Sequence, residues 1–171
     1  MMVRFLFVSV LLGWRKALMV SCSLALVACT SVNSKVGGVF DFDTDVKITF
    51  IVDSDINPDE KNKPSPLFVR FYELKSEKLF KRADFIELYE RDEEILGADF
   101  VGKQELRRLT PGEDRTERFV VSDEARYIAL YAEFFQYKGA KHSVIFPVSV
   151  NNVIRNAYKI KISGNSIALA E

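Results

Sequence analysis

The chain has 171 residues, of which 48% are apolar and 12% aromatic, with 24 basic and 24 acidic side chains. This composition suits one small globular domain and excludes an intrinsically disordered chain. Residues 1–28 hold three cations and no acid, so the other 143 residues carry 21 basic and 24 acidic side chains. The slight acidic excess argues against a nucleic-acid partner, because binding to phosphates requires a surplus of Lys and Arg.

The N-terminal residues have the pattern of an export signal. Two uncharged stretches, 5–14 and 17–28, flank Arg15 and Lys16, and the second ends in small residues before Cys29. Each of two central cations would cost a spanning helix about 2.5–3.5 kcal/mol, so one transmembrane helix through both stretches is not expected. A cationic flank, a short apolar region and small residues together predict a secretory signal.

The end of this signal resembles a bacterial lipobox, since Leu26-Val27-Ala28-Cys29 follows the pattern apolar, small, small, Cys. The resemblance implies that residues 1–28 are removed and that Cys29 becomes an acylated N-terminus. Two or more acyl chains anchor a protein stably, and lipoprotein processing supplies three. By analogy with enteric sorting, Thr30 after the cysteine favours the outer membrane. The alternative is an ordinary secretory signal that leaves Cys29 as a thiol.

Residues 29–44 are expected to form the lipidated cysteine and a tether. Thr30–Thr44 contains small and polar residues without a regular pattern. These fifteen residues reach roughly 50 Å when extended, which lets the domain stand off its membrane. The remaining residues, 45–171, are expected to form the folded domain.

Most of this domain has the period-two pattern of β-strands. From Asp45 to Asp53 apolar and polar residues alternate, which predicts a half-buried strand. Leu67–Leu74 is apolar on both faces except at Arg70, which indicates a more central strand. Further strands are expected at 104–109, 115–121, 126–135, 143–150, 157–163 and 166–170. About eight strands at this short spacing favour antiparallel sheets packed face to face.

A helical segment interrupts the strands at about 76–97. Asp84 and Glu87 match a capping box, and Gly97 is typical of a helix end. Phe85, Leu88 and Tyr89 share one helical face by their spacing. One or two short helices inserted into a β protein are therefore predicted.

Candidate catalytic groups are few. His142 is the only histidine, which excludes a histidine-based zinc site and leaves a serine or cysteine mechanism without a signature. Five helical acids could supply a carboxylate pair for glycoside hydrolysis, but a solvated helix face is the simpler interpretation: Glu87, Glu90, Asp92, Glu93 and Glu94. We expect neither enzyme activity nor a cofactor.

The segment that begins at Asp53 starts like a calcium loop but departs from the motif. Pro58 stands where the turn of an EF-hand needs Gly, and Pro64 stands where it needs Glu. Asp55 and Asn57 are instead expected to accept backbone N–H hydrogen bonds that shape the turn before Pro58.

The whole loop Asp53–Pro66 is unusually long for a compact domain, and it contains three of the five prolines. Prolines limit the backbone and so reduce the entropy that is lost on binding. Residues 59–63 at its middle, four of them charged, are expected to face solvent. Taken by itself, this pattern fits a partner-binding loop and an adaptable surface excursion equally well.

A series of short motifs resembles, in order and spacing, the type VI secretion lipoprotein family called TssJ or VasD. The match runs from about Val46 to Val148. The residues that carry it are Asn57-Pro58, Lys63-Pro64-Ser65-Pro66, Arg70, Tyr72, Leu74, Phe80, Ala83-Asp84-Phe85, Leu88-Tyr89, Leu96-Gly97-Ala98-Asp99 and Leu109-Thr110-Pro111-Gly112-Glu113.

The resemblance implies a mainly β fold, a transthyretin-like two-sheet antiparallel β-sandwich with a small helical insertion. It also implies a lipid anchor on the periplasmic face of the outer membrane. The long first loop would dock onto the periplasmic C-terminal part of the inner-membrane protein TssM, in a complex that also contains TssL. The partner-binding residues carried over by position are Asp55, Ile56, Asn57, Pro58, Asp59, Glu60, Lys61, Asn62 and Lys63. A lipoprotein that binds a small ligand or acts as a hydrolase is the alternative.

Overall fold

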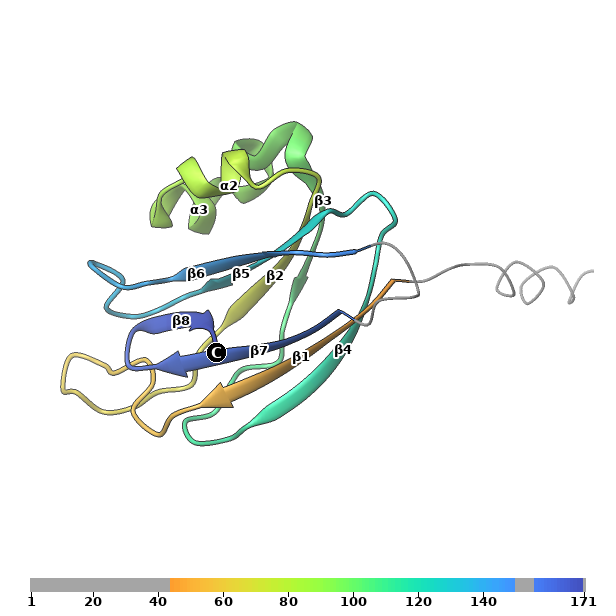
Figure 1. The fold of residues 1–171 in the computed structure, drawn as a ribbon. Helices are drawn as coiled ribbons and strands as arrows, with labels where there is room; N and C mark the ends of the chain where they lie inside the picture. Colours follow the sequence, from red (N-terminus) through yellow and green to blue (C-terminus); the bar gives the residue numbers. More distant parts are fainter. Residues whose placement is uncertain (1–43, 150–155, 171) are drawn as a thin grey trace, which may run out of the picture. The chain divides into compact units, whose positions relative to one another are not determined.

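The computed structural model describes residues 44–149 and 156–170 (Figure 1). The predicted signal 1–28, Cys29 and the tether up to residue 43 lie outside the described residues. Within these two ranges no helix is long and apolar enough to cross a bilayer. The elements are β1 Thr44–Val52, β2 Val69–Leu74, α2 Lys78–Arg82, α3 Phe85–Leu96, the 3₁₀ helix η2 Gly97–Asp99, β3 Phe100–Glu105, β4 Arg115–Val121, β5 Tyr127–Ala132, β6 Ser143–Pro147, β7 Asn156–Ser163 and β8 Ser166–Leu169.

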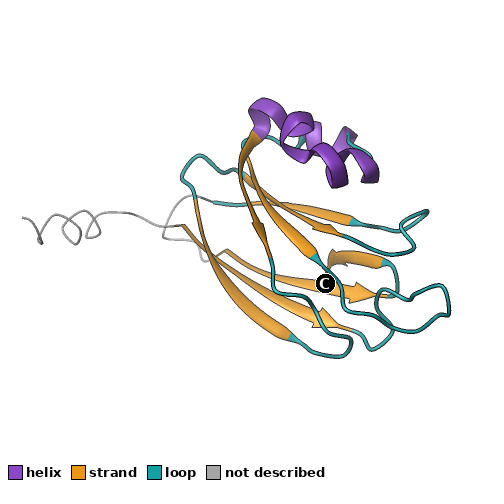
Figure 2. Cartoon of the chain, turned by 180° about the vertical axis from the view of Figure 1, so that it is seen from behind, coloured by secondary structure: helices purple, strands orange, loops and turns teal. Residues whose placement is uncertain are grey.

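The strands form two four-stranded sheets, with orders β4-β1-β7-β8 and β3-β2-β5-β6. The sheets face each other, and α2 and α3 cover the outer side of the second sheet (Figures 1 and 2). The mainly β sandwich with a helical insert is thus confirmed. One detail differs from the expected antiparallel pattern, since β1 and β7 run parallel. No crossover helix is needed for this pair, because the chain passes through the other sheet between the two strands.

The core lies between the sheets, as the alternating pattern predicts. Val46, Ile48 and Phe50 of β1 are completely buried, and Ile160 and Ile162 of the neighbouring β7 are buried beside them. Each such side chain contributes about 1.5–3 kcal/mol through its removal from water. The two strands therefore supply the central hydrophobic surface of their sheet.

The helical layer begins and ends as predicted. The capping box is present, since the Asp84 carboxylate accepts a hydrogen bond from the Glu87 N–H at 2.8 Å and the Glu87 carboxylate accepts one from the Asp84 N–H at 3.0 Å. At the other end Gly97 has a φ of +45°, and its N–H donates to the Glu93 carbonyl. A Cβ would be strained in this conformation, so Gly97 ends α3.

Strand boundaries differ from the predictions in the middle of the chain. β3 spans Phe100–Glu105, whereas the pattern predicts a strand over 104–109. The apolar residues that suggest the later strand, Leu106 and Leu109, are buried but lie in the loop after β3. Leu109 makes only an isolated bridge to Leu67. β6 ends at Pro147 on an outer position of its sheet, which suits a residue without an N–H. Residue 150 of the predicted sixth strand lies outside the described residues.

Asp92 was expected on the solvated helix face, and this expectation is wrong. Only 7% of Asp92 is exposed, and its carboxylate accepts hydrogen bonds from the Tyr72 hydroxyl at 2.6 Å and from Lys103 Nζ at 3.0 Å. Arg70 Nη1 lies 3.3 Å away. The backbone of α3 is kinked at Arg91, immediately before Asp92. Partners on β2 and β3 therefore compensate the buried charge, which no helical pattern reveals.

These contacts also set the protonation of the group. Burial alone would raise the pKa of Asp92, but the hydrogen bonds from Tyr72 and Lys103 outweigh burial and hold the pKa below its ordinary value. The carboxylate therefore stays ionised and links α3 to the sheet beneath it.

Candidate functional site

The long loop Asp53–Pro66 lies at the end of the sandwich opposite to Thr44, where β1 begins. The nine residues of β1 separate the two points by about 30 Å. Backbone and side-chain groups of the loop bond to the segments after β3, β5 and β7, which reach the same end of the sandwich (Figure 1). The loop is therefore built into one end of the domain.

The base of the loop is fixed by two buried residues. Ile56 is completely buried, and Asn57 is 1% exposed with a left-handed φ of +48°. The Asn57 side chain accepts a hydrogen bond from the Phe135 N–H at 2.8 Å and donates one to the Pro66 carbonyl at 3.0 Å. The Asn57 N–H donates to the Gly164 carbonyl at 2.8 Å. Asn57 thus accepts a backbone N–H as predicted, but the donor belongs to a remote loop.

The acids before Asn57 have similar structural roles. Asp55 accepts a hydrogen bond from the Gly164 N–H at 3.2 Å, and Asp53 is bonded to the Lys161 ammonium. Hydrogen bonds from Lys161 and then Ser163 lower the pKa of Asp53. No group of three or more His, Cys, Asp or Glu side chains in ranges 44–149 and 156–170 is arranged to hold a metal.

The tip of the loop is organised around Asp59. Its carboxylate accepts hydrogen bonds from the N–H groups of Lys61 at 2.8 Å and Lys63 at 2.9 Å. Its own N–H donates to the Lys63 carbonyl at 2.9 Å, and its carbonyl accepts from the Asn62 N–H and from Gln136 Nε2. A closed turn results, and the residues that it exposes are Glu60, Lys61, Asn62 and Lys63.

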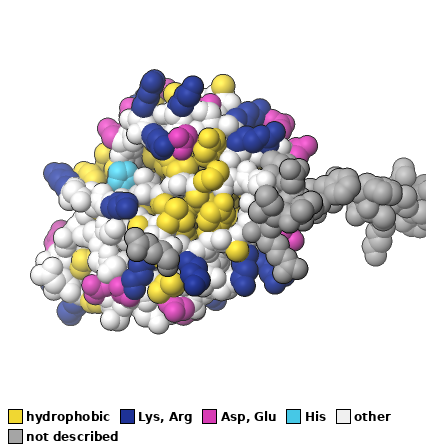
Figure 3. Space-filling view, viewed as in Figure 1, with side chains coloured by type: hydrophobic (Ala, Val, Ile, Leu, Met, Phe, Trp, Pro, Cys, Tyr) yellow, Lys and Arg dark blue, Asp and Glu magenta, His cyan; other side chains and the backbone are white. Residues whose placement is uncertain are grey.

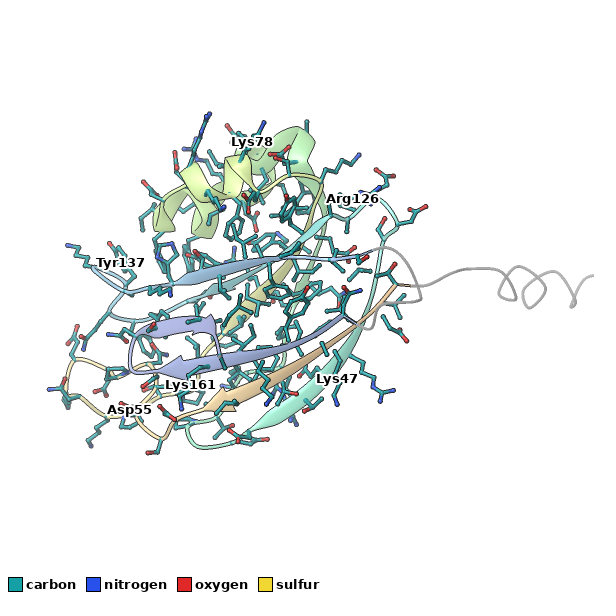
Figure 4. The ribbon with its side chains drawn as sticks, in the orientation of Figure 1. Lys47, Asp55, Lys78, Arg126, Tyr137 and Lys161 are labelled. Atoms are coloured by element: carbon teal, nitrogen blue, oxygen red, sulfur yellow. The ribbon has the colours of Figure 1, made fainter. Side chains whose placement is uncertain are left out.

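The structure therefore divides the nine predicted residues into two groups. Those that hold the loop to the sandwich are Asp55, Ile56 and Asn57, and those that form or flank the exposed tip are Pro58, Asp59, Glu60, Lys61, Asn62 and Lys63. Figure 4 labels Asp55 at this end of the domain, together with Tyr137 on the segment after β5.

Sequence reasoning missed the residues that support the loop from elsewhere. Phe135 and Gln136 follow β5 and bond to Asn57 and Asp59, and the Phe135 ring is 67% exposed beside the loop. Gly164 supports the loop from the turn after β7. Contacts between strand-end loops depend on the pairing order of the strands, and no local pattern in the sequence reports that order.

The other candidate groups have packing roles. The His142 ring lies edge-on to Phe85 at 5.3 Å and to Tyr131 at 5.7 Å, so it fills space between α3 and β5.

A surface groove of about 190 Å³ near the start of β2 is lined by the Arg70 and Glu133 ion pair, in which Arg70 Nε lies 2.6 Å from Glu133 Oε1. This groove lies at the surface rather than between the sheets.

A two-sheet sandwich with a helical layer and a hydrogen-bonded loop at one end defines a small structural domain. Residues 44–165 match the profile of a family described as type VI secretion lipoprotein, with VasD, EvfM and TssJ among its names. The chain belongs to this family. The family is a structural component of the secretion system, which agrees with the expectation of a protein that is not an enzyme.

Solved structures of low sequence identity share the fold. The T6SS lipoprotein TssJ1 from Pseudomonas aeruginosa is 26% identical, with a TM-score of 0.67 over 75% of this chain and 95% of that one. Serratia marcescens Lip, a membrane bound component of the type VI secretion system, is 22% identical, with a TM-score of 0.67 over 75% of this chain and 97% of that one. A structure described as the T6SS protein TssM C-terminal domain (869–1107) from EAEC is 20% identical, with a TM-score of 0.62 over 74% of this chain and 98% of that one.

Below 25% identity, as in the last two cases, the similarity shows the fold alone. Among curated protein sequences, none matches this chain significantly.

Proposed function

We propose that the protein is an outer-membrane lipoprotein that anchors the type VI secretion membrane complex at the periplasmic face. In this proposal residues 1–28 are a removed signal, Cys29 carries the acyl chains and residues 30–43 form the tether. The folded domain begins with β1 at Thr44, one residue earlier than the sequence pattern predicts. The β1–β2 loop docks onto the periplasmic C-terminal part of a TssM-like inner-membrane protein, which is joined to TssL.

The observation that carries this proposal is the ordered tip of the loop. Two kinds of hydrogen bond close the turn: the carboxylate Oδ1 of Asp59 accepts from two backbone N–H groups, and the backbone carbonyl of Asp59 accepts from a third. The side chains of Lys61 and Lys63 are exposed on this turn. A loop that is already ordered loses little conformational entropy when it binds. Charged side chains on a rigid turn are well suited to recognise a polar protein surface.

Two comparisons support the choice of partner and location. One similar structure is described as the C-terminal domain of TssM, and Serratia marcescens Lip is described as membrane bound. Those statements concern the other proteins. Membership in the type VI secretion lipoprotein family makes a TssM-like partner and a location at a membrane the most economical assignment for this chain.

The proposed mechanism combines a stable lipid anchor with a contact of modest affinity. Acyl chains at Cys29 and a tether of up to roughly 50 Å would confine the loop near its membrane. Confinement raises the effective concentration of the loop at a membrane-bound partner to about the millimolar range. A modest affinity between loop and partner then suffices to hold the assembly at the outer membrane.

Reversal of the tip charges tests the docking. We expect the Lys61→Glu/Lys63→Glu variant to bind the periplasmic part of the TssM-like protein at least about tenfold more weakly, equivalent to ~1.4 kcal/mol, because two exposed cations of the tip change sign. Isothermal titration calorimetry measures the change.

The matched control reverses two exposed cations of α2 on the helical layer, Lys78→Glu/Arg82→Glu. Figure 4 labels Lys78 on this layer. An equal loss of affinity in both variants would contradict docking through the loop.

Removal of the acylated residue tests the anchor. The Cys29→Ser variant is expected to appear in the soluble periplasmic fraction with an unchanged circular dichroism spectrum, because residue 29 precedes the folded domain and only the lipid attachment is lost. Fractionation of the envelope followed by immunoblotting measures the distribution. Retention of the variant in the outer-membrane fraction would show that the acyl chains are not the anchor.

A further inference from the structure

The order of layers leaves one sheet face uncovered. The helices pack on the outer side of sheet β3-β2-β5-β6, whereas no described element lies on the outer side of sheet β4-β1-β7-β8 (Figures 1 and 2). The side chains on that outer side alternate with the buried residues of β1 and β7. This face is therefore open to a partner.

Basic side chains gather on the uncovered face. Lys47 of β1 stands directly opposite Arg118 of β4, and Lys159 of β7 stands beside Thr49. Lys161 follows on the same side of β7. Figure 4 labels Lys47 and Lys161 along this sheet, and Figure 3 shows both basic and acidic atoms in this part of the surface. We call the four residues Lys47, Arg118, Lys159 and Lys161 the basic face.

Three of these cations are not neutralised within the domain. Lys161 pairs with Asp53, but Lys47, Arg118 and Lys159 form no ion pair with another residue of the described ranges. Like charges directly across two strands destabilise the pairing, so the opposition of two cations is unfavourable for the isolated domain.

The surroundings of these cations add little acid. The acids near these cations are Asp45, near the start of β1, and Asp53, which follows the end of β1 and pairs with Lys161. Residues 29–171 have more acidic than basic side chains, so this concentration of cations is a local property of one face.

We propose that the basic face lies against anionic phospholipid headgroups of the membrane that holds the acyl anchor. Clustered Lys and Arg are attracted to anionic lipid surfaces, and the attraction is confined to a Debye length of about 8 Å at physiological salt. β1 runs through this face and begins at Thr44, directly after the proposed tether. The inference rests on the acylation proposed for Cys29.

The position of the tether decides between possible occupants. A tether that joins the uncovered sheet at the start of β1 brings this face near the membrane of the anchor at a high effective concentration, so even a few cations are sufficient for orientation. The same cations are too few to hold the domain on a membrane without the anchor. In the bound orientation β1 runs along the membrane surface, and the exposed loop tip points along that surface.

Chemical labelling of lysines tests the orientation. The acylated full chain is reconstituted in vesicles of phosphatidylcholine, and in vesicles of equal parts phosphatidylcholine and phosphatidylglycerol. Mass spectrometry then follows the rate of amine acetylation. We expect Lys47 and Lys159 to react roughly fivefold more slowly in the anionic vesicles only, with the difference removed in about 1 M salt, where the Debye length is ~3 Å. Lys78 and Lys138 serve as internal references.

Two variants separate this effect from general changes. Lys47→Gln/Arg118→Gln is expected to remove the protection of Lys159, whereas the matched Lys78→Gln/Arg82→Gln variant is expected to retain it. Equal labelling rates in both kinds of vesicle would overturn the inference while the anchor stands. Protection that depends on protein concentration in detergent would assign the face to a second copy and would also overturn it.

A chain that does not stay with either vesicle would contradict the acyl anchor, and the inference that depends on it would fail with it.

Discussion

Replacement of Asp59–Asn62 by the two-residue turn Asn-Gly is expected to abolish binding to the periplasmic part of the TssM-like protein. The change removes the exposed tip except for Lys63 and leaves the buried base at Ile56 and Asn57, whose hydrogen bonds do not involve the deleted residues. We expect the domain to fold and the affinity to fall by more than about 100-fold, equivalent to ~2.7 kcal/mol. Isothermal titration calorimetry measures the affinity, and thermal unfolding checks the fold.

A second variant examines the order of the tip at constant length. Asp59→Ala removes the carboxylate that accepts from Lys61 and Lys63, but it keeps all exposed side chains of the tip. Because a disordered tip must be ordered on binding, we expect Asp59→Ala to lower the affinity for the TssM-like protein by about tenfold, an intermediate loss.

Unchanged binding by the variant with the shortened Asn-Gly loop would exclude the loop from the interface.

Replacement of Asp92 by alanine is expected to lower the free energy of unfolding by about 3 kcal/mol. The mutation removes the acceptor of the Tyr72 hydroxyl and the counter-ion that Arg70 and Lys103 share. Arg70 keeps its ion pair with Glu133 and Lys103 keeps its contact with Glu93, so the main loss is the partner of the buried hydroxyl and part of the charge compensation under α3. Urea denaturation measures the change.

The neighbouring Glu93 is the matched control for this mutation. It contacts the same Lys103 at 3.2 Å, but its side chain is 62% exposed. Exposed ion pairs contribute roughly 0–1 kcal/mol, so Glu93→Ala should change stability by less than that. Equal losses for the two alanine variants would contradict the structural role of Asp92.

The same carboxylate predicts a pH dependence. The pKa of Asp92 is lower in the folded protein than its ordinary value near 3.8, so the folded state favours the ionised form. The stabilisation is therefore present above about pH 5 and is lost as the pH falls toward and through the folded pKa. We expect Asp92→Asn to be less stable than the wild type at pH 7 and the difference to shrink below pH 4. A constant difference in urea denaturation over this range would contradict the assignment.

Much of the fold could be predicted because the relevant signals are local. The period-two alternation in β1 and β7 identifies their buried faces, and the Asp84 and Glu87 capping box marks the start of α3 to the residue. The position of β3 could not be predicted from the pattern of polar and apolar residues, which places this strand four residues too late in the chain. A buried loop and a strand both require apolar residues, and composition does not distinguish them.

The sequence by itself determined the family, the sandwich class and the existence of a long proline-rich loop, because these properties follow from the order of short motifs and from the spacing of apolar residues. Only the tertiary structure decided that Ile56 and Asn57 support the loop while Glu60 and Lys61 are exposed, and that Asp92 is buried. The physical reason is that each of these roles depends on partners distant in the chain. Phe135 and Gly164 reach the loop, and Tyr72 reaches Asp92, only after the strands have paired.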